Sequence, residues 1–192
     1  WLRSEMEHVA TDGSNSLAYD EQTVLAMNPL TGELSLPGWD ESYTKDQLRG
    51  LLARYESIDE EQLWKNLQTF LEAVIPVAHE AGINMAIHPD DPPWDMFGLP
   101  RIIINKENIH RMMKMVDNPH NGVTFCSGSY GTNLENDLPD MIRSLKGRIH
   151  FAHVRNLKFI TPTNFQEAPH LSSEGTFDMH AIMRALYDIG FD

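Results

Sequence analysis

Residues 83–93, INMAIHPDDPP, join a short apolar run to a proline-rich loop, with His88 at the junction. Two later stretches of the chain have the same form, GVTFCSG at 122–128 and RIHFAHVRN at 148–156. Apolar runs of this length, bounded by a glycine or a basic turn and by a polar loop, are typical of parallel strands buried on both faces. The three stretches therefore predict three parallel strands.

The last residue of each apolar run is one that can bind a metal ion: His88, Cys126 and His153. Parallel strands bring their carboxyl ends to one face of a fold, and in a (β/α)8 barrel the active site is built on that face. We therefore predict an α/β fold, a (β/α)8 barrel, in which the three side chains surround one point. A structural role for each residue taken singly stays open, because a lone buried cysteine commonly acts as a small hydrophobic residue.

The composition provides enough apolar material for one core and a strongly acidic balance. The chain has 192 residues, 41% of them hydrophobic, and its 28 acidic and 15 basic side chains give a formal net charge of −13. Nucleic acid is not an expected partner, because binding to phosphate backbones depends on clustered lysine and arginine. We expect no membrane association, since no apolar run approaches the ~20 residues that span a bilayer. The one cysteine excludes an internal disulfide, which fits a cytoplasmic location.

The order of the predicted elements indicates one domain over residues 1–192 that is the central part of a longer barrel. Residues 11–58 are rich in turn formers and indicate an excursion from the barrel, with a short hairpin around Thr31–Gly32. Residues 59–192 are predicted to form consecutive helix and strand units. A complete (β/α)8 barrel takes ~200 to ~250 residues. We therefore expect the remaining strands and helices to lie outside this stretch.

Capping signals predict where the helices begin. Thr44 is the expected N-cap of a helix to Tyr55, and Ser57 with Glu60 has the spacing of a capping box for a longer helix that Gly82 ends. Further helices are expected at 105–116, 134–145 and 178–190. The segments 127–133 and 155–175 are expected to be irregular loops.

The proline-rich loop after His88 leaves its strand on the face where a substrate would bind. It carries Asp90, Asp91 and Trp94, whose side chains either reach a substrate or brace the loop. The sequence does not decide between these two roles.

Several long motifs resemble one known family. IHPDDPPWDMFGLPRII (87–103), FCSGSYGTN (125–133) and HFAHVRN (150–156), with LAYD (17–20) and the stretch 72–93, are similar to the bacterial D-mannonate dehydratases of hexuronate degradation. The resemblance runs along most of the chain. It implies a xylose-isomerase-like TIM barrel, a Mn²⁺ or Fe²⁺ ion, and loss of water from the sugar acid D-mannonate to give 2-dehydro-3-deoxy-D-gluconate.

The resemblance also implies roles for single residues. The metal ligands of the family match His88, Cys126 and His153. A fourth ligand, an aspartate in an Arg-Pro-Asp-His-Gly motif, has no counterpart before Asp192. The catalytic residues, a histidine beside that aspartate and a later tyrosine, are likewise expected beyond Asp192. A thiolate and two imidazoles also suit zinc, so Mn²⁺ or Fe²⁺ follows from the resemblance and not from the ligands themselves.

Three polar residues near the strand ends are candidates for binding the substrate. Arg155 lies two residues past His153 and so on the same side of an extended chain, where its planar fork suits a carboxylate. A salt bridge to one of the many acids is the structural alternative. Asn156 is a candidate partner for a sugar hydroxyl. Ser127 begins the small-residue segment SGSYG, for which an ordinary glycine-rich turn after a strand is the favoured interpretation. If the segment binds a ligand, its backbone N–H groups suit a substrate carboxylate.

Three other classes of function are alternatives to the dehydratase. A sugar isomerase or epimerase on the same barrel normally holds its metal with carboxylates, and no role for Cys126 exists in that scheme. A barrel-type nuclease or phosphodiesterase conflicts with the acidic balance. A non-catalytic domain with a structural zinc would need a closed tetrahedral site. The expected assembly is a homodimer that acts on a small-molecule sugar acid.

Overall fold

The computed structural model describes residues 8–9, 11, 13, 15–16, 18–26, 30 and 44–192. Near the start of the chain, two short strands, β1 (His8–Val9) and β2 (Asn15–Ser16), pair antiparallel. The hairpin expected around Thr31–Gly32 lies outside the described residues, as does much of the excursion predicted for 11–58.

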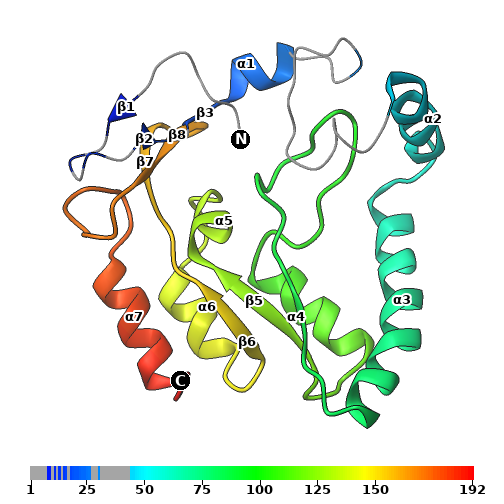
Figure 1. Cartoon of the computed structure of the whole chain (residues 1–192). Coiled ribbons are helices and arrows are strands. Elements are labelled where there is room, and N and C mark those ends of the chain that lie inside the picture. The colour runs from blue at the N-terminus through cyan, green and yellow to red at the C-terminus, as the bar shows by residue number, and fades with distance from the viewer. Residues whose placement is uncertain are drawn as a thin grey trace.

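The three predicted strands form one parallel sheet. They are β4 (Met85–Ile87), β5 (Asn121–Cys126) and β6 (Ile149–His153), in the order β4-β5-β6. Cys126 lies opposite His153 in the register of β5 and β6. β5 is buried along its whole length because it has a strand on each side and helices beside it (Figure 1). The prediction of parallel strands with their carboxyl ends at one edge is confirmed.

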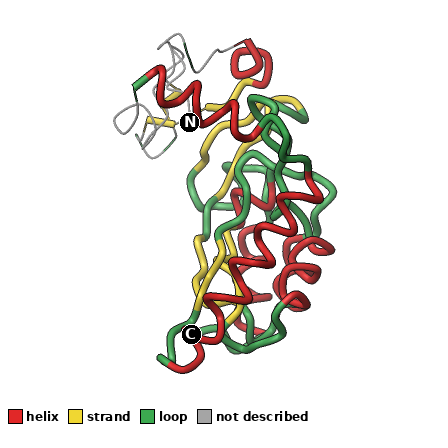
Figure 2. Tube along the Cα trace, turned by 90° about the vertical axis from the view of Figure 1, so that its right-hand side faces the viewer, coloured by secondary structure: helices red, strands yellow, loops and turns green. Residues whose placement is uncertain are grey.

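The helices that alternate with these strands form a second layer on one side of the sheet, as the edge-on view in Figure 2 shows. Their bounds are α3 (Glu60–Glu80), α4 (Lys106–Met115), α6 (Leu138–Ser144) and α7 (Met179–Asp188). The core lies between the two layers, where Trp64, Ile75, Ile109 and Ile142 are almost completely buried. The chain thus has an α/β architecture. None of its described helices has the length and apolar character needed to cross a membrane.

Polar side chains fix the starts of the helices. Thr44 caps α2 (Lys45–Tyr55), as the sequence predicts. The predicted capping box of Ser57 and Glu60 is wrong, because Asp59 caps α3 and its carboxylate accepts the backbone N–H of Gln62 at 2.8 Å. A carboxylate there also interacts favourably with the positive end of the helix dipole, which a neutral serine does less well. The helix continues through Pro76 and ends before Gly82, whose φ of +65° suits a residue without a side chain.

The segment 155–175 was predicted to be an irregular loop, and this is wrong. It contains β7 (Asn156–Thr161) and β8 (Asn164–Ala168), which pair with each other and with β3 (Ala18–Asp20) in the order β3-β8-β7. This antiparallel sheet stands at the end of the molecule where the parallel strands finish (Figure 1). Its pairing joins two regions of the chain that are far apart in sequence.

Aromatic packing explains why this second sheet forms. The rings of Tyr19 from β3 and Phe165 from β8 stack with their centroids 5.1 Å apart, and the ring of Phe159 from β7 lies 5.3 Å from that of Phe165. Such contacts across neighbouring strands are the main stabilising units of an antiparallel sheet. The short helix α1 (Glu21–Ala26) follows β3 directly. Residues 18–20, which lie within the predicted excursion, thus pair with β8 in the second sheet.

Candidate metal centre

The structure brings His88, Cys126 and His153 together at the carboxyl edge of the parallel sheet. The candidate ligand atoms of these three residues all lie within 4.8 Å of one another. His88 follows β4, Cys126 ends β5 and His153 ends β6. In the part of the chain that the structure describes, these three are the histidine, cysteine, aspartate or glutamate residues whose ligand atoms lie close enough together to hold a metal ion. The three side chains thus surround one point, as the strand pattern predicted.

Hydrogen bonds orient the two imidazole rings. Nδ1 of His88 lies 2.8 Å from the carbonyl oxygen of Pro89. Because a carbonyl only accepts hydrogen bonds, this contact places the proton of neutral His88 on Nδ1 and leaves Nε2 as the electron-pair donor. Nδ1 of His153 lies 3.4 Å from Sγ of Cys126. The two rings approach each other with their centroids 6.3 Å apart.

The surroundings of Cys126 favour the thiolate form that binds metals. Burial by itself raises the pKa of the Cys126 thiol, but hydrogen bonds with His88 and Ser129 bring the pKa below its ordinary value. The same contact with Cys126 raises the pKa of His88. Burial and the charge of Arg155 lower the pKa of His153, which keeps that ring neutral. A thiolate between two imidazoles is a soft ligand set that a divalent transition metal fits well.

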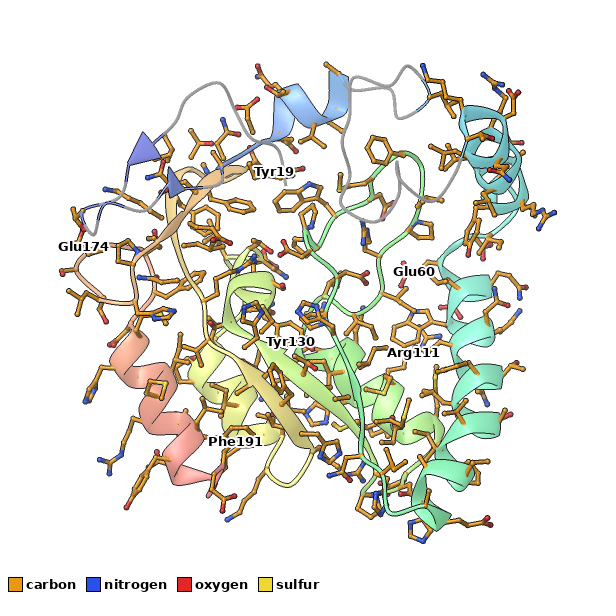
Figure 3. The ribbon with its side chains drawn as sticks, viewed as in Figure 1. Tyr19, Glu60, Arg111, Tyr130, Glu174 and Phe191 are labelled. Carbon is orange, nitrogen blue, oxygen red and sulfur yellow. The ribbon has the colours of Figure 1, made fainter. Side chains whose placement is uncertain are left out.

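The segment after Cys126 was predicted to be an irregular turn, and it is instead a short helix, α5 (Ser127–Gly131). Its five residues are all buried. Tyr130 anchors this helix in the interior of the molecule, where its ring lies 5.2 Å from that of Phe125 (Figure 3). Burial raises the pKa of the Tyr130 hydroxyl far above its ordinary value, so this side chain stays neutral. Gly131 gives the helix room in the interior, because a Cβ atom there would come within 2.2 Å of the ring of Phe177.

Ser129 of α5 faces the sulfur of Cys126. Its hydroxyl lies 3.1 Å from Sγ, and its backbone N–H donates to Sγ at 3.4 Å. The same hydroxyl lies 3.1 Å from Oδ2 of Asp91. Sequence reasoning did not single out Ser129. The signal for it was its place three residues after Cys126, which becomes a contact only when the segment is helical.

Arg155 lies beside the three candidate ligands but is engaged by acids. Its guanidinium contacts Asp91 at 2.6 Å and Glu167 of β8 at 3.3 Å, and only 13% of its side chain is exposed. Gly128 makes room for it, since a Cβ atom at that position would come within 1.9 Å of Nε of Arg155. The arginine is therefore held in a fixed place by two carboxylates and a glycine.

The other two candidate substrate residues have backbone partners. The hydroxyl of Ser127 lies 2.7 Å from both the backbone nitrogen and the carbonyl oxygen of Arg155. Asn156 is fully buried, and its amide donates to the carbonyl oxygens of Pro169 and Leu171. Both side chains thus hold the chain around Arg155 in this structure, and their contacts with a substrate stay predictions.

The proline-rich loop after His88 has side chains of two kinds. Asp90 accepts hydrogen bonds from the backbone of Ile102 and Ile103, and Trp94 donates to the hydroxyl of Tyr19 at 2.8 Å. Asp90 thus holds the start of the loop to its end at Ile102 and Ile103, and Trp94 holds the loop to β3. Asp91 instead points to Arg155 and Ser129. Asp90 and Trp94 therefore have the bracing role, and a contact of Asp91 with a substrate stays a prediction.

Comparisons with known proteins give a consistent result. A family model described as D-mannonate dehydratase (UxuA) matches residues 1–192. The chain is 53% identical to mannonate dehydratase 2 of Halalkalibacterium halodurans and 51% identical to the mannonate dehydratase of Brachyspira hyodysenteriae. Both alignments cover 100% of this chain and 56% of the relative. The chain thus spans about half the length of the curated relatives it matches.

Solved structures extend the comparison to the fold. The crystal structure of a mannonate dehydratase from Streptococcus suis serotype 2 has a TM-score of 0.85 at 38% identity, and the match covers 100% of this chain and 52% of that one. The IOLI protein, solved with a bound zinc atom, has a TM-score of 0.51 at 14% identity and covers 77% of this chain and 56% of its own. At that low identity, the second likeness concerns the fold alone.

Proposed function

This chain belongs to the D-mannonate dehydratase family, and on that basis we propose that the full-length protein removes water from D-mannonate to give 2-dehydro-3-deoxy-D-gluconate. In this reaction a proton leaves the carbon next to the carboxylate and a hydroxyl group leaves the neighbouring carbon. The resulting enol then becomes the 2-keto acid. The observation in this chain that carries the proposal is the meeting of His88, Cys126 and His153 at three strand ends.

We propose a xylose-isomerase-like (β/α)8 barrel as the complete fold. Its support is the parallel order β4-β5-β6 with helices on one side, which is the arrangement of consecutive units of such a barrel. The candidate ligands lie at the carboxyl edge of these strands, where barrel enzymes have their active sites. A cytoplasmic location is supported by Cys126, because a metal-binding thiolate needs a reducing compartment to stay unoxidised.

We propose that His88, Cys126 and His153 hold a Mn²⁺ or Fe²⁺ ion. Three observations support a metal ion at these residues. Their ligand atoms lie within 4.8 Å of one another, Nε2 of His88 carries a lone pair, and the pKa of the Cys126 thiol is lowered. A bound divalent ion supplies positive charge next to the substrate carboxylate and lowers the cost of removing the neighbouring proton. His88, Cys126 and His153 would hold and orient that charge, and the sulfur of Cys126 would do so from a fully buried position.

We propose that Arg155 binds the carboxylate of the substrate. The guanidinium is fixed beside the candidate ligands, and Asp91 and Glu167 already show that carboxylates approach it from two directions. Negative charge grows on the substrate carboxylate as the proton leaves, so a fixed cation stabilises the transition state more than the ground state. Ser127 orients the backbone of Arg155, and Asn156, the next residue, is proposed to contact a hydroxyl of the sugar acid.

A direct assay tests the proposed reaction. Purified full-length protein incubated with D-mannonate should produce a 2-keto acid, measured by its semicarbazone absorbance, because the dehydrated enol converts to the ketone. Removal of the metal with a chelator should abolish this product, and Mn²⁺ or Fe²⁺ should restore it. Mg²⁺ should restore little, because a thiolate and two imidazoles bind it weakly. Full turnover by protein that is free of metal would contradict the proposal.

The space around Arg155 gives a second prediction. Gly128→Ala places a Cβ atom within 1.9 Å of Nε of Arg155, so the guanidinium has to move away from its carboxylate partners. We expect kcat/KM for D-mannonate to fall by ~10-fold or more, since misplacement of a positioning group is costly. Metal content should be unchanged. Gly50→Ala on α2 is the control, because a Cβ there meets nothing within 4 Å. A Gly128→Ala enzyme with normal kinetics would remove Arg155 from substrate binding.

A further inference from the structure

A buried thiolate depends on hydrogen bonds from the protein, because no water reaches it. Cys126 is 0% exposed and Ser129 is 1% exposed. The described donors that reach Sγ of Cys126 from α5 are the hydroxyl of Ser129 at 3.1 Å and its backbone N–H at 3.4 Å. Hydrogen bonds to a charged acceptor are stronger than those between neutral groups. These two contacts therefore matter most in the state in which Cys126 is a thiolate.

We propose that Ser129 is a positioning residue that holds the Cys126 thiolate toward the metal, through its backbone N–H and its hydroxyl. The inference rests on the proposed metal site. The Ser129 hydroxyl carries one proton, which it donates either to Sγ of Cys126 or to Oδ2 of Asp91, 3.1 Å away. Because Oδ2 already accepts from Nη2 of Arg155 at 2.6 Å, the proton of Ser129 is available to a thiolate at Cys126. The Asp91 side chain is only 14% exposed, so these contacts are poorly screened by solvent.

The network joins the metal ligand to the candidate substrate group. It runs from Cys126 through Ser129 and Asp91 to Arg155, with each neighbouring pair in direct contact. Asp91 lies on the loop that follows His88, so the same loop carries a metal ligand and the carboxylate at the centre of the network. Groups around metal ligands commonly set the orientation and basicity of those ligands. Ser129 is the member of this network that contacts the candidate ligand Cys126 itself.

The Ser129→Ala variant of the full-length enzyme tests the first step of this network. Alanine keeps the backbone N–H contact and removes only the hydroxyl. We expect the dissociation constant for Mn²⁺, measured by competition with a chelating dye, to rise by ~10- to 100-fold. In the cobalt-substituted enzyme, the sulfur-to-cobalt charge-transfer band should move to longer wavelength, because a thiolate with fewer hydrogen bonds gives up electron density more easily. Ser144→Ala is the control, since that hydroxyl bonds to the Met141 carbonyl on α6.

The outcomes separate this inference from the metal site on which it rests. The cobalt-substituted wild-type enzyme should show the charge-transfer band. If Ser129→Ala has the same band and the same dissociation constant as the wild type, the role of Ser129 is overturned and the metal site stands. Absence of the band in the cobalt-substituted wild-type enzyme would overturn both, because Cys126 would then not be a ligand. A melting temperature of each metal-free variant near that of the wild type shows that the comparison is made on folded protein.

Discussion

Cys126→Ser in the full-length enzyme is expected to abolish stoichiometric metal binding and to lower activity by ~10²-fold or more. A metal-bound thiol loses its proton readily, whereas a serine hydroxyl stays protonated near neutral pH and is a poor ligand. The site of Cys126 strengthens this contrast, since hydrogen bonds with His88 and Ser129 lower the pKa of its thiol despite burial. Elemental analysis of purified protein, paired with turnover of D-mannonate, measures both effects.

Thermal melting provides the control for Cys126→Ser. The variant differs from the wild type by one atom at a buried position, so the metal-free proteins should melt at similar temperatures. Added Mn²⁺ should raise the melting temperature of the wild type and not that of the variant, because a ligand stabilises only the folded form that binds it. Undiminished metal occupancy in the folded variant would exclude Cys126 from the site.

Arg155→Lys should lower kcat/KM for D-mannonate by ~10²-fold or more, which corresponds to ~2.7 kcal/mol of lost transition-state stabilisation. Lysine keeps the positive charge but loses the planar fork that grips both oxygens of a carboxylate. Because negative charge grows on that carboxylate as the proton leaves, the loss should appear in kcat as well as in KM. Metal content should stay the same. Steady-state kinetics normalised to bound metal measures the effect.

The alternative to substrate binding is that Arg155 only forms salt bridges within the protein. If its role is only to pair with Asp91 and Glu167, Arg155→Lys should lower stability and leave turnover per metal-loaded molecule nearly intact. Arg111→Lys is the matched control, because Arg111 also pairs with a carboxylate, that of Glu61, but on the exposed faces of α3 and α4. An Arg155→Lys enzyme that is unstable yet normally active would refute the substrate role.

The parallel sheet and the meeting of three candidate ligands could be predicted from the sequence because they depend on local patterns. An apolar run bounded by turn residues specifies a buried strand, and parallel strands place their last residues on one face. Thr44 and Asn105 likewise cap the helices that follow them, as short polar side chains do in many helices. In each case the residues that decide the structure lie within a few positions of one another.

The features that the sequence did not reveal depend on distant contacts. β7 and β8 were predicted as a loop because their turn residues are frequent and because the partner strand β3 lies far away in the chain. The ring of Tyr19, stacked on Phe165, could not be anticipated from either segment alone. Ser129 and Glu167 escaped notice for the same reason. Ser129 needs the short helix α5 to reach Cys126, and Glu167 needs the hairpin to reach Arg155.

X-ray absorption at the edge of the bound metal tests the central claim most directly, because it reports which atoms surround the ion. For the full-length enzyme loaded with Mn²⁺ or Fe²⁺, we predict one sulfur neighbour at about 2.3 Å or slightly longer, together with nitrogen and oxygen neighbours from two imidazoles and further ligands. The sulfur contribution should be absent in any metal retained by Cys126→Ser. A wild-type spectrum that requires only nitrogen and oxygen neighbours would contradict a metal held by His88, Cys126 and His153.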